Sequence, residues 1–145
     1  QTTDDLDALL RELTEQYVRR GRRVSFEPGG LAPLPFARQA LRRAVANLVD
    51  NALRYAGEPV ELRSRATPGG AIVEVLDRGP GVPPEQAERL KQPFTRLDPS
   101  RSGAGGSGLG LAIVERVARA HRGTLELLPR EGGGLAARIT LGRAP

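Results

Sequence analysis

The sequence of 145 residues contains no cysteine, no methionine and no tryptophan, and these absences restrict what the protein can be. Without cysteine there is no disulfide framework, no zinc–thiolate site and no cysteine nucleophile. Because the sequence begins at Gln1 and has no methionine, we expect it to be a piece of a larger protein. It also lacks a signal-peptide pattern and any apolar run near the ~18 residues of a membrane-spanning helix, so we expect one soluble domain.

Aromatic residues and lysine are also scarce. The three phenylalanines and two tyrosines are too few for the stacking platform on which proteins bind single-stranded nucleic acid. Lys91 is the only lysine among the 22 basic residues, and the formal net charge of +5 makes nucleic acid the first partner to consider. However, arginines alternate with acidic residues, as in Arg11-Glu12 and Arg130-Glu131, and a genome rich in arginine codons explains the same composition. We expect no nucleic-acid partner.

Hydrophobic patterning predicts an alternation of helices and strands. Helices are expected over four segments, 4–20, 37–55, 83–91 and 109–121. Strands are expected over five segments, 23–27, 59–66, 71–76, 124–128 and 135–141, with 31–36 extended. Residues 92–107 have no periodicity and read as a mobile loop or lid. This order predicts an α/β fold in which helices are layered on one mixed sheet.

Two asparagines stand one helical turn apart in the segment Asn47-Leu-Val-Asp-Asn51-Ala-Leu-Arg54-Tyr55. At about 100° per residue, Asn47 and Asn51 lie ~40° apart, with Arg54 and Tyr55 on the same side of the helix. The apolar stripe of this helix lies on another face. Asparagine disfavours a helix interior because its amide competes for backbone hydrogen bonds. The pair therefore indicates a polar function, and two buried asparagines that satisfy nearby backbone groups are the alternative.

Asp77 directly follows the strand predicted over 71–76 and precedes two glycines in Asp77-Arg-Gly79-Pro-Gly81. One interpretation of this segment is a plain turn. The other is a carboxylate that accepts a hydrogen bond from a ligand N–H, next to glycines that let the backbone approach closely. The segment by itself does not decide between the two.

The segment Gly105-Gly-Ser-Gly-Leu-Gly110 leads into the last predicted helix. Backbone N–H groups at a helix N-terminus bind anions, and glycines let a phosphate come close to them. The segment is not a Walker A loop, because no Gly-Lys-Ser/Thr follows, and it is a poor Rossmann fingerprint, because a long loop precedes it. A flexible linker into a helix is the alternative to a phosphate-binding loop.

Together, the order and separations of these segments resemble the catalytic ATP-binding (HATPase/GHKL) domain of bacterial sensor histidine kinases, most of all the EnvZ osmosensor type. The family's boxes resemble, in order, Asn47–Tyr55 (N box), Asp77–Gly81 (G1), Pro93-Phe94 (F) and Gly106–Leu111 (G2). The resemblance extends from Asp4 to Leu141. It implies a Bergerat-type two-layer α/β sandwich with a mixed, mostly antiparallel sheet, three main helices and an ATP lid at about 92–107. Residues 1–145 would then form a single catalytic domain.

The same resemblance implies that ATP and Mg²⁺ bind. Asn51 would coordinate Mg²⁺ through its amide oxygen, with Asn47 and Arg54 beside the phosphates as the other catalytic residues. Asp77 would accept from the adenine amino group, and Tyr55 would lie along the base. The other residues expected at the site shape the turn after Asp77 or close the lid: Gly79, Gly81, Phe94, Gly106, Ser107, Gly108, Leu109 and Gly110. Arg96 and Arg101 in the lid are either phosphate contacts or solvated side chains.

The identity of residue 47 distinguishes the reactions known in this fold. By the resemblance, ATPases of the gyrase and MutL types and the anti-sigma-factor serine kinases carry a glutamate there, which acts as a general base. Asn47 cannot take a proton, whereas a neutral histidine nucleophile already has a free ring lone pair. Asn47 therefore favours transfer of the γ-phosphate to histidine. A nucleotide-binding regulatory module without catalytic output, or a GHKL-type ATPase, is the alternative.

His121, the only histidine, lies at the end of the last predicted helix and outside any phosphoacceptor motif. We expect it to be a cationic helix cap. The phosphoacceptor and dimerisation domain is thus expected to be absent from this chain and to be its partner, with a response regulator downstream. The isolated domain is expected to be a monomer. By the resemblance, the parent protein is anchored in the bacterial inner membrane with this domain in the cytoplasm.

Overall fold

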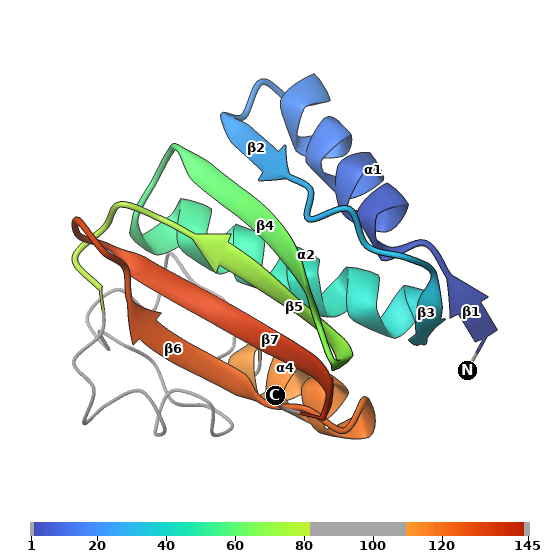
Figure 1. Ribbon diagram of the computed structural model, residues 1–145. Coiled ribbons are helices and arrows are strands. Elements are labelled where there is room, and N and C mark those ends of the chain that lie inside the picture. The colour runs from blue at the N-terminus through green and yellow to red at the C-terminus, as the bar shows by residue number, and fades with distance from the viewer. Residues whose placement is uncertain (1, 82–109, 144–145) are drawn as a thin grey trace.

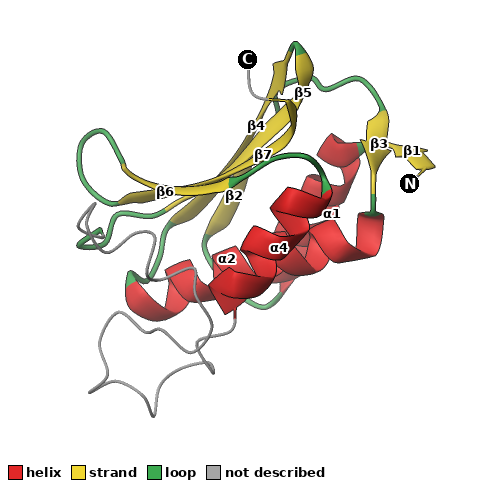
Figure 2. Ribbon diagram, turned by 90° about the horizontal axis from the view of Figure 1, so that it is seen from below, coloured by secondary structure: helices red, strands yellow, loops and turns green. Residues whose placement is uncertain are grey.

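Three helices lie side by side on one face of a five-stranded sheet in the computed structural model, which describes residues 2–81 and 110–143 (Figures 1 and 2). The helices are α1 (Leu6–Arg19), α2 (Arg38–Tyr55) and α4 (Gly110–Ala120), with α2 between the other two. They confirm three of the predicted helices, with ends that differ by at most two residues. The helix expected over 83–91 and the lid expected at 92–107 lie outside the described residues.

The sheet confirms the expected two-layer α/β sandwich. Its strands, in spatial order, are β2 (Val24–Glu27), β4 (Val60–Thr67), β5 (Gly69–Leu76), β7 (Leu135–Arg143) and β6 (Leu125–Pro129). Strands β2 and β4 are parallel, and the other neighbouring pairs of this sheet are antiparallel. The sheet is therefore mixed and mostly antiparallel.

The sequence does not predict a second, two-stranded sheet at the N-terminal end. Strand β1 (Thr2–Asp4) pairs antiparallel with β3 (Leu34–Phe36). Asp4 was expected in the first helix, but the helix begins at Leu6 because the Asp5 side chain caps it and accepts a hydrogen bond from the Ala8 N–H (3.0 Å). Strands of three residues are too short to show an alternating pattern.

The core lies between the helical layer and the inner face of the sheet. The apolar stripes expected on the first two helices are buried, and they meet apolar residues of the sheet there. The buried residues include Leu6, Leu9, Leu10, Leu13, Leu41, Val45, Leu48, Val60, Leu62, Val73, Val75 and Ile139. The stripe of α2 fixes the rotation of this helix, and Asn47 and Asn51 are left only half-buried. None of the described helices is long and apolar enough to cross a membrane.

Helix α4 ends in a turn whose left-handed residue is not a glycine. The helix ends at Ala120, and the residue in the left-handed conformation is Arg122, with φ of 64°. The Gly123 N–H then returns to the Ala118 carbonyl oxygen (2.8 Å), as in a Schellman motif. Gly123 is required for a different reason, because a Cβ there would overlap the carbonyl oxygen of Thr140 on β7.

Candidate functional site

The C-terminal half of α2 presents the two asparagines away from the core. The side chains of Asn47 and Asn51 form no hydrogen bond to a backbone group of the described residues. This speaks against the alternative that they satisfy buried backbone groups. The Asn51 Oδ1 atom accepts a hydrogen bond from Arg54 Nη1 (3.3 Å), one turn further along the helix. Arg54 is exposed and Tyr55, the last residue of α2, is half-buried. The polar face expected from the sequence is therefore formed.

Asp77 is buried at the end of β5, with only 6% of the residue exposed. Its Oδ1 atom accepts from the Gly79 N–H (2.9 Å), which is the turn that the sequence allowed. The same oxygen also accepts from the Leu135 N–H of β7 (3.1 Å), which a plain turn does not explain. Oδ2 has no hydrogen-bond partner among the described residues, and this atom is not fully enclosed by the protein. This oxygen is free to accept from a ligand.

Two glycines show what packs against the end of α2. A Cβ on Gly79 would lie 2.5 Å from the Ala56 Cβ, so the turn after Asp77 packs directly against the end of α2. A Cβ on Gly110 would lie 3.7 Å from Asn51 Nδ2, so α4 begins beside this asparagine. The turn after β5 and the start of α4 thus both lie against the end of α2.

Gly81 and the segment before it pack against the loop between β6 and β7. Gly81 has φ of 76°, a left-handed conformation that favours glycine. A Cβ on it would lie 3.3 Å from the Gly134 carbonyl oxygen. The predicted site residues that lie outside the described part of the chain are Phe94, Arg96, Arg101, Gly106, Ser107, Gly108 and Leu109.

Arg130 is a contact of Asp77 that the sequence does not reveal. Its Nη1 atom donates to the Asp77 carbonyl oxygen (3.1 Å), and its Nη2 atom forms an ion pair with Glu61 of β4. The hydrogen bond from Arg130 holds the pKa of the Glu61 carboxyl below its usual value, so Glu61 is ionised at neutral pH. The neighbouring Glu131-Gly-Gly-Gly134 segment signals an unusual loop between β6 and β7, but it does not indicate a contact with Asp77.

Tyr17 fixes the position of α2 from the side of α1. Its hydroxyl donates to Asp50 Oδ1 (2.6 Å) and approaches the Ala46 carbonyl oxygen (3.3 Å). Burial raises the pKa of the Tyr17 hydroxyl well above its usual value, and the bond to the Asp50 carboxylate raises it further. Asp50 and Ala46 each precede one of the two asparagines by one residue, so this contact holds the helix segment that carries them.

His121 corrects one expectation. It does cap α4, because Nδ1 donates to the Val117 carbonyl oxygen (2.8 Å), but the residue is buried and the ring is not cationic. Its Nε2 atom lies 3.0 Å from the Ala37 N–H, which can only donate, so Nε2 must be the unprotonated nitrogen. The neutral ring joins the end of α4 to the start of α2.

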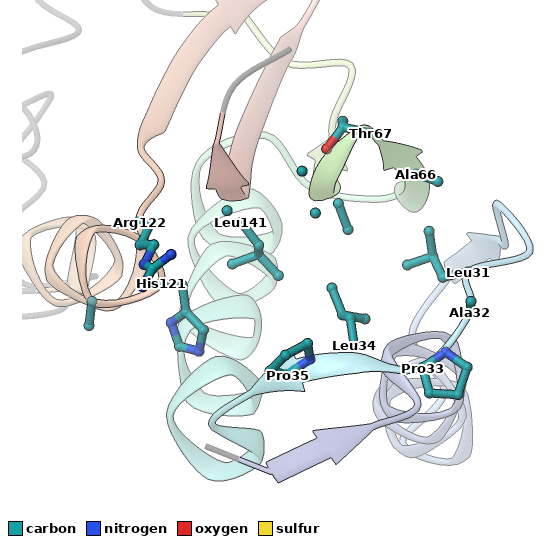
Figure 3. A pocket seen from close by; sticks show the side chains of 15 residues that line it. Leu31, Ala32, Pro33, Leu34, Pro35, Ala66, Thr67, His121, Arg122 and Leu141 are labelled. Carbon is teal, nitrogen blue, oxygen red and sulfur yellow. The ribbon is translucent and has the colours of Figure 1, made fainter.

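A cavity of about 810 Å³ lies at the other end of the sheet (Figure 3). Its walls include Leu34, Thr67, Gly70, His121 and Leu141. Gly70 is near the start of β5 and Asp77 follows its end, so at about 3.3 Å per residue the cavity lies ~23 Å from Asp77. The cavity is therefore separate from the region around the asparagines.

The donor set around Asn51 suits a magnesium ion only with help from a ligand. No group of three or more histidine, cysteine or acidic side chains that could hold a metal occurs in residues 2–81 and 110–143. Mg²⁺ prefers oxygen ligands and is often held by one or two protein oxygens together with substrate phosphates and water. Asn51 Oδ1 is such an oxygen, and the long bond from Arg54 leaves it exchangeable. The site thus fits a magnesium–phosphate complex.

Comparison with known proteins places residues 37–145 in the family described as histidine kinase-, DNA gyrase B-, and HSP90-like ATPase. The sensor histidine kinase GtrS of Pseudomonas aeruginosa is 38% identical over 139 residues, which are 96% of this chain and 28% of GtrS. The chain spans about a quarter of the length of the curated relatives that it matches.

Solved structures agree with the sequence comparison. The histidine kinase domain of the Escherichia coli osmosensor EnvZ is 38% identical, with a TM-score of 0.71 over 99% of this chain and 91% of that chain. Full-length ShkA, solved in complex with AMPPNP, is 27% identical, with a TM-score of 0.81 over 99% of this chain and 31% of that chain. These similarities confirm the resemblance that the sequence motifs carry.

Proposed function

Since this chain belongs to the family of histidine kinase-, DNA gyrase B- and HSP90-like ATPases and has the fold of a histidine kinase catalytic domain, we propose that it binds Mg·ATP and phosphorylates a histidine on a separate phosphoacceptor domain. One observation carries this proposal: the turn that bonds Asp77 and the start of α4 at Gly110, which are far apart in the sequence, both lie against the end of α2 that carries Asn51. The AMPPNP complex of the similar protein ShkA supports a nucleotide as the ligand.

Asp77 recognises the adenine base in this proposal. Its free Oδ2 accepts a hydrogen bond from the 6-amino group, while Oδ1 remains occupied by Gly79 and Leu135. Tyr55, at the end of α2, lies along the base. Gly79 and Gly81 have no side chains, which leaves room for the base beside the turn after Asp77. A carboxylate is the appropriate residue because, when ionised, it only accepts hydrogen bonds.

The asparagines and Arg54 act at the phosphates. Asn51 would hold a magnesium ion through Oδ1, and the exposed guanidinium of Arg54 would be available to a phosphate oxygen. Asn47 lies beside the phosphates one turn earlier. Magnesium, when bound, would neutralise negative charge on the phosphates. We propose that the lid and the glycine segment that follows it close over the phosphates. The residues involved are Phe94, Arg96, Arg101, Gly106, Ser107, Gly108, Leu109 and Gly110.

In the proposed reaction the imidazole nitrogen of the acceptor histidine attacks the γ-phosphorus. A P–N bond forms, the P–O bond to the β-phosphate oxygen breaks, ADP leaves and the ring releases its proton. This domain needs no general base, because a neutral histidine already has a free lone pair. Asn47 is consistent with this, since an amide cannot take a proton from water or from a serine hydroxyl.

The parent protein is proposed to be a membrane-anchored sensor kinase of a two-component system. Its partners would be its own phosphoacceptor and dimerisation domain and a downstream response regulator, with this domain in the cytoplasm and monomeric when isolated. The names of the relatives, which are sensor histidine kinases and sensor proteins, support this assignment. We propose that residues 1–145 form one domain, with the lid at about 92–107.

The test is label transfer from Mg·[γ-³²P]ATP to a dimeric phosphoacceptor domain of the same kinase. We expect label on the acceptor that is stable to alkali and labile to acid, as phosphohistidine is. Asn51→Ala should reduce transfer at saturating ATP by more than it reduces ATP affinity, because the metal also positions the phosphates. Acid-stable label on serine, rapid phosphate release without acceptor label, or normal transfer by Asn51→Ala would contradict the proposal.

A further inference from the structure

We propose that Arg130 is a positioning residue for Asp77 and thereby sets the preference of this domain for adenine over 6-oxo purines. The inference rests on the proposed function, in which Asp77 reads the 6-amino group. Arg130 donates to the main-chain carbonyl oxygen of Asp77, so it would act through the aspartate and not by contact with the base.

The Arg130 side chain connects distant parts of the sheet at the end of β5. Arg130 directly follows the edge strand β6, whereas its ion-pair partner Glu61 lies on β4, and β7 and β5 lie between these two strands. Glu61 pairs with Leu76, the residue immediately before Asp77. The guanidinium therefore joins β4 to the first residue beyond β5. Its side chain is only 5% exposed, so water does not compete strongly for these bonds.

The loop that Arg130 anchors needs an external restraint. It contains Gly132, Gly133 and Gly134, all with positive φ, and glycine loses more conformational freedom on ordering than any other residue. The Arg130 backbone closes the loop through bonds with Gly134 and Gly133 (both 2.9 Å). The Arg130 side chain then fixes the closed loop to Asp77 and Glu61.

The loop in turn sets the orientation of the Asp77 carboxylate. Leu135, the residue after the glycines, donates its N–H to Asp77 Oδ1 (3.1 Å) and accepts the Asp77 N–H (3.0 Å). A Cβ on Gly134 would overlap the Asp77 carbonyl oxygen, so the loop and Asp77 are in direct contact. When Oδ1 is held by Leu135 and Gly79, Oδ2 is the oxygen left for the ligand. Loss of the anchor would let the carboxylate rotate away from this orientation.

The experiment compares the affinities of Mg·ATP and Mg·ITP by calorimetry, because inosine carries an oxygen where adenine carries the amino group. Arg130→Ala should weaken ATP about five- to tenfold and leave ITP within about twofold, as expected for a displaced charged hydrogen bond. Arg130→Lys should be intermediate, because one ammonium group keeps the charge but not the fork that reaches two partners. Arg138→Ala is the matched control: it removes an ion pair of the same sheet, with Glu74 (3.1 Å), that does not involve Asp77.

Each outcome distinguishes a role of Arg130 in base specificity from a role in protein stability alone. Selective loss of ATP preference in Arg130→Ala, with Arg138→Ala unchanged, supports the inference. Equal weakening of ATP and ITP, or an unchanged preference, would show a purely structural role and overturn it. If Arg130→Ala does not fold, Arg130→Lys and Glu61→Gln serve instead, and full retention of the preference in both contradicts the inference. If the parent chain binds ATP and ITP equally, Asp77 does not recognise the 6-amino group of adenine. That result would be a failure of the proposed function, and it is measured without any Arg130 variant.

Discussion

At the residue scale, the two oxygens of Asp77 have separate tasks. Oδ1 holds the protein together by accepting from Gly79 and Leu135, while Oδ2 has no described partner and is available to a base. Under the proposed function, this division lets one buried carboxylate serve both the protein's own hydrogen bonds and the base. It also makes the aspartate testable by a substitution that alters only one of the two tasks.

Asp77→Asn should keep the structural bonds and lose the base contact. An asparagine can still accept with Oδ1, but it presents an NH₂ donor where the 6-amino group needs an acceptor. A hydrogen bond to a charged group contributes about 1.5–3 kcal/mol, so ATP affinity should fall roughly 10- to 100-fold in calorimetry. Glu126→Gln, an exposed carboxylate on β6, is the control for the lost charge. Unchanged ATP affinity in Asp77→Asn would remove Asp77 from the base site.

The sequence predicts residues whose role follows from local position, and it fails where a role depends on the sheet order. Asn47 and Asn51 stand out because asparagine is unfavourable in a helix interior, whereas Asp77 became a candidate only through the order of the motifs and the family resemblance. Arg130 lies 53 residues from Asp77, and only the arrangement of the strands between them brings the two into contact. For the same reason the sequence could not show that His121 meets Ala37, which is 84 residues away.

At the element scale, the placement of α2 depends on contacts at both of its ends and along its side. α1 contacts it through Tyr17, α4 through Gly110, and the end of α4 through His121. Long elements with strong periodicity were predictable, because their apolar stripes alone determine which face is buried. The β1–β3 pair and the left-handed Arg122 were not, because they depend on single contacts between distant segments.

Tyr17→Phe should weaken the α1–α2 contact in a pH-dependent way. At neutral pH the lost bond to Asp50 should cost about 1–2 kcal/mol of unfolding free energy in urea. Because burial raises the pKa of Tyr17 above its ordinary value of 10.0, the folded state keeps a proton that the unfolded state loses, and stability falls as pH rises above about 10. The variant should show less of this alkaline loss. Tyr55→Phe is the control, and equal alkaline loss in parent and Tyr17→Phe would contradict the account.

Arg122→Gly and Gly123→Ala should have opposite effects on stability. A left-handed conformation is unfavourable for arginine and free for glycine, so Arg122→Gly should raise the unfolding free energy by about 0.5–1 kcal/mol. Gly123→Ala should lower it by more than ~2 kcal/mol, because the new Cβ meets the Thr140 carbonyl oxygen. Urea unfolding monitored by circular dichroism measures both. Destabilisation by Arg122→Gly would mean that the arginine side chain contributes more than its backbone strain removes.

At the scale of the whole molecule, strand β5 links two regions of different character. One end leads to Asp77, the glycine loop and the polar face of α2, and the other end borders the cavity with Leu34 and Thr67 (Figures 1 and 3). The cavity end is lined mostly by apolar and small residues, whereas Asp77, Arg130 and Glu61 bring charged groups together at the other end. We assign the nucleotide to the Asp77 end because of this chemistry, not because of the shape of the surface.

The most direct test of this assignment is to follow backbone amide resonances by NMR while Mg·ATP is added. The account predicts saturable shifts of Asn51, Asp77, Gly79 and Gly110, together with Leu135, whose amide bonds Asp77 Oδ1. Amides around the cavity, such as Leu34 and Thr67, should not move. Saturable shifts confined to the cavity end, with Asp77 and Asn51 unaffected, would contradict the central claim that these elements form the nucleotide site.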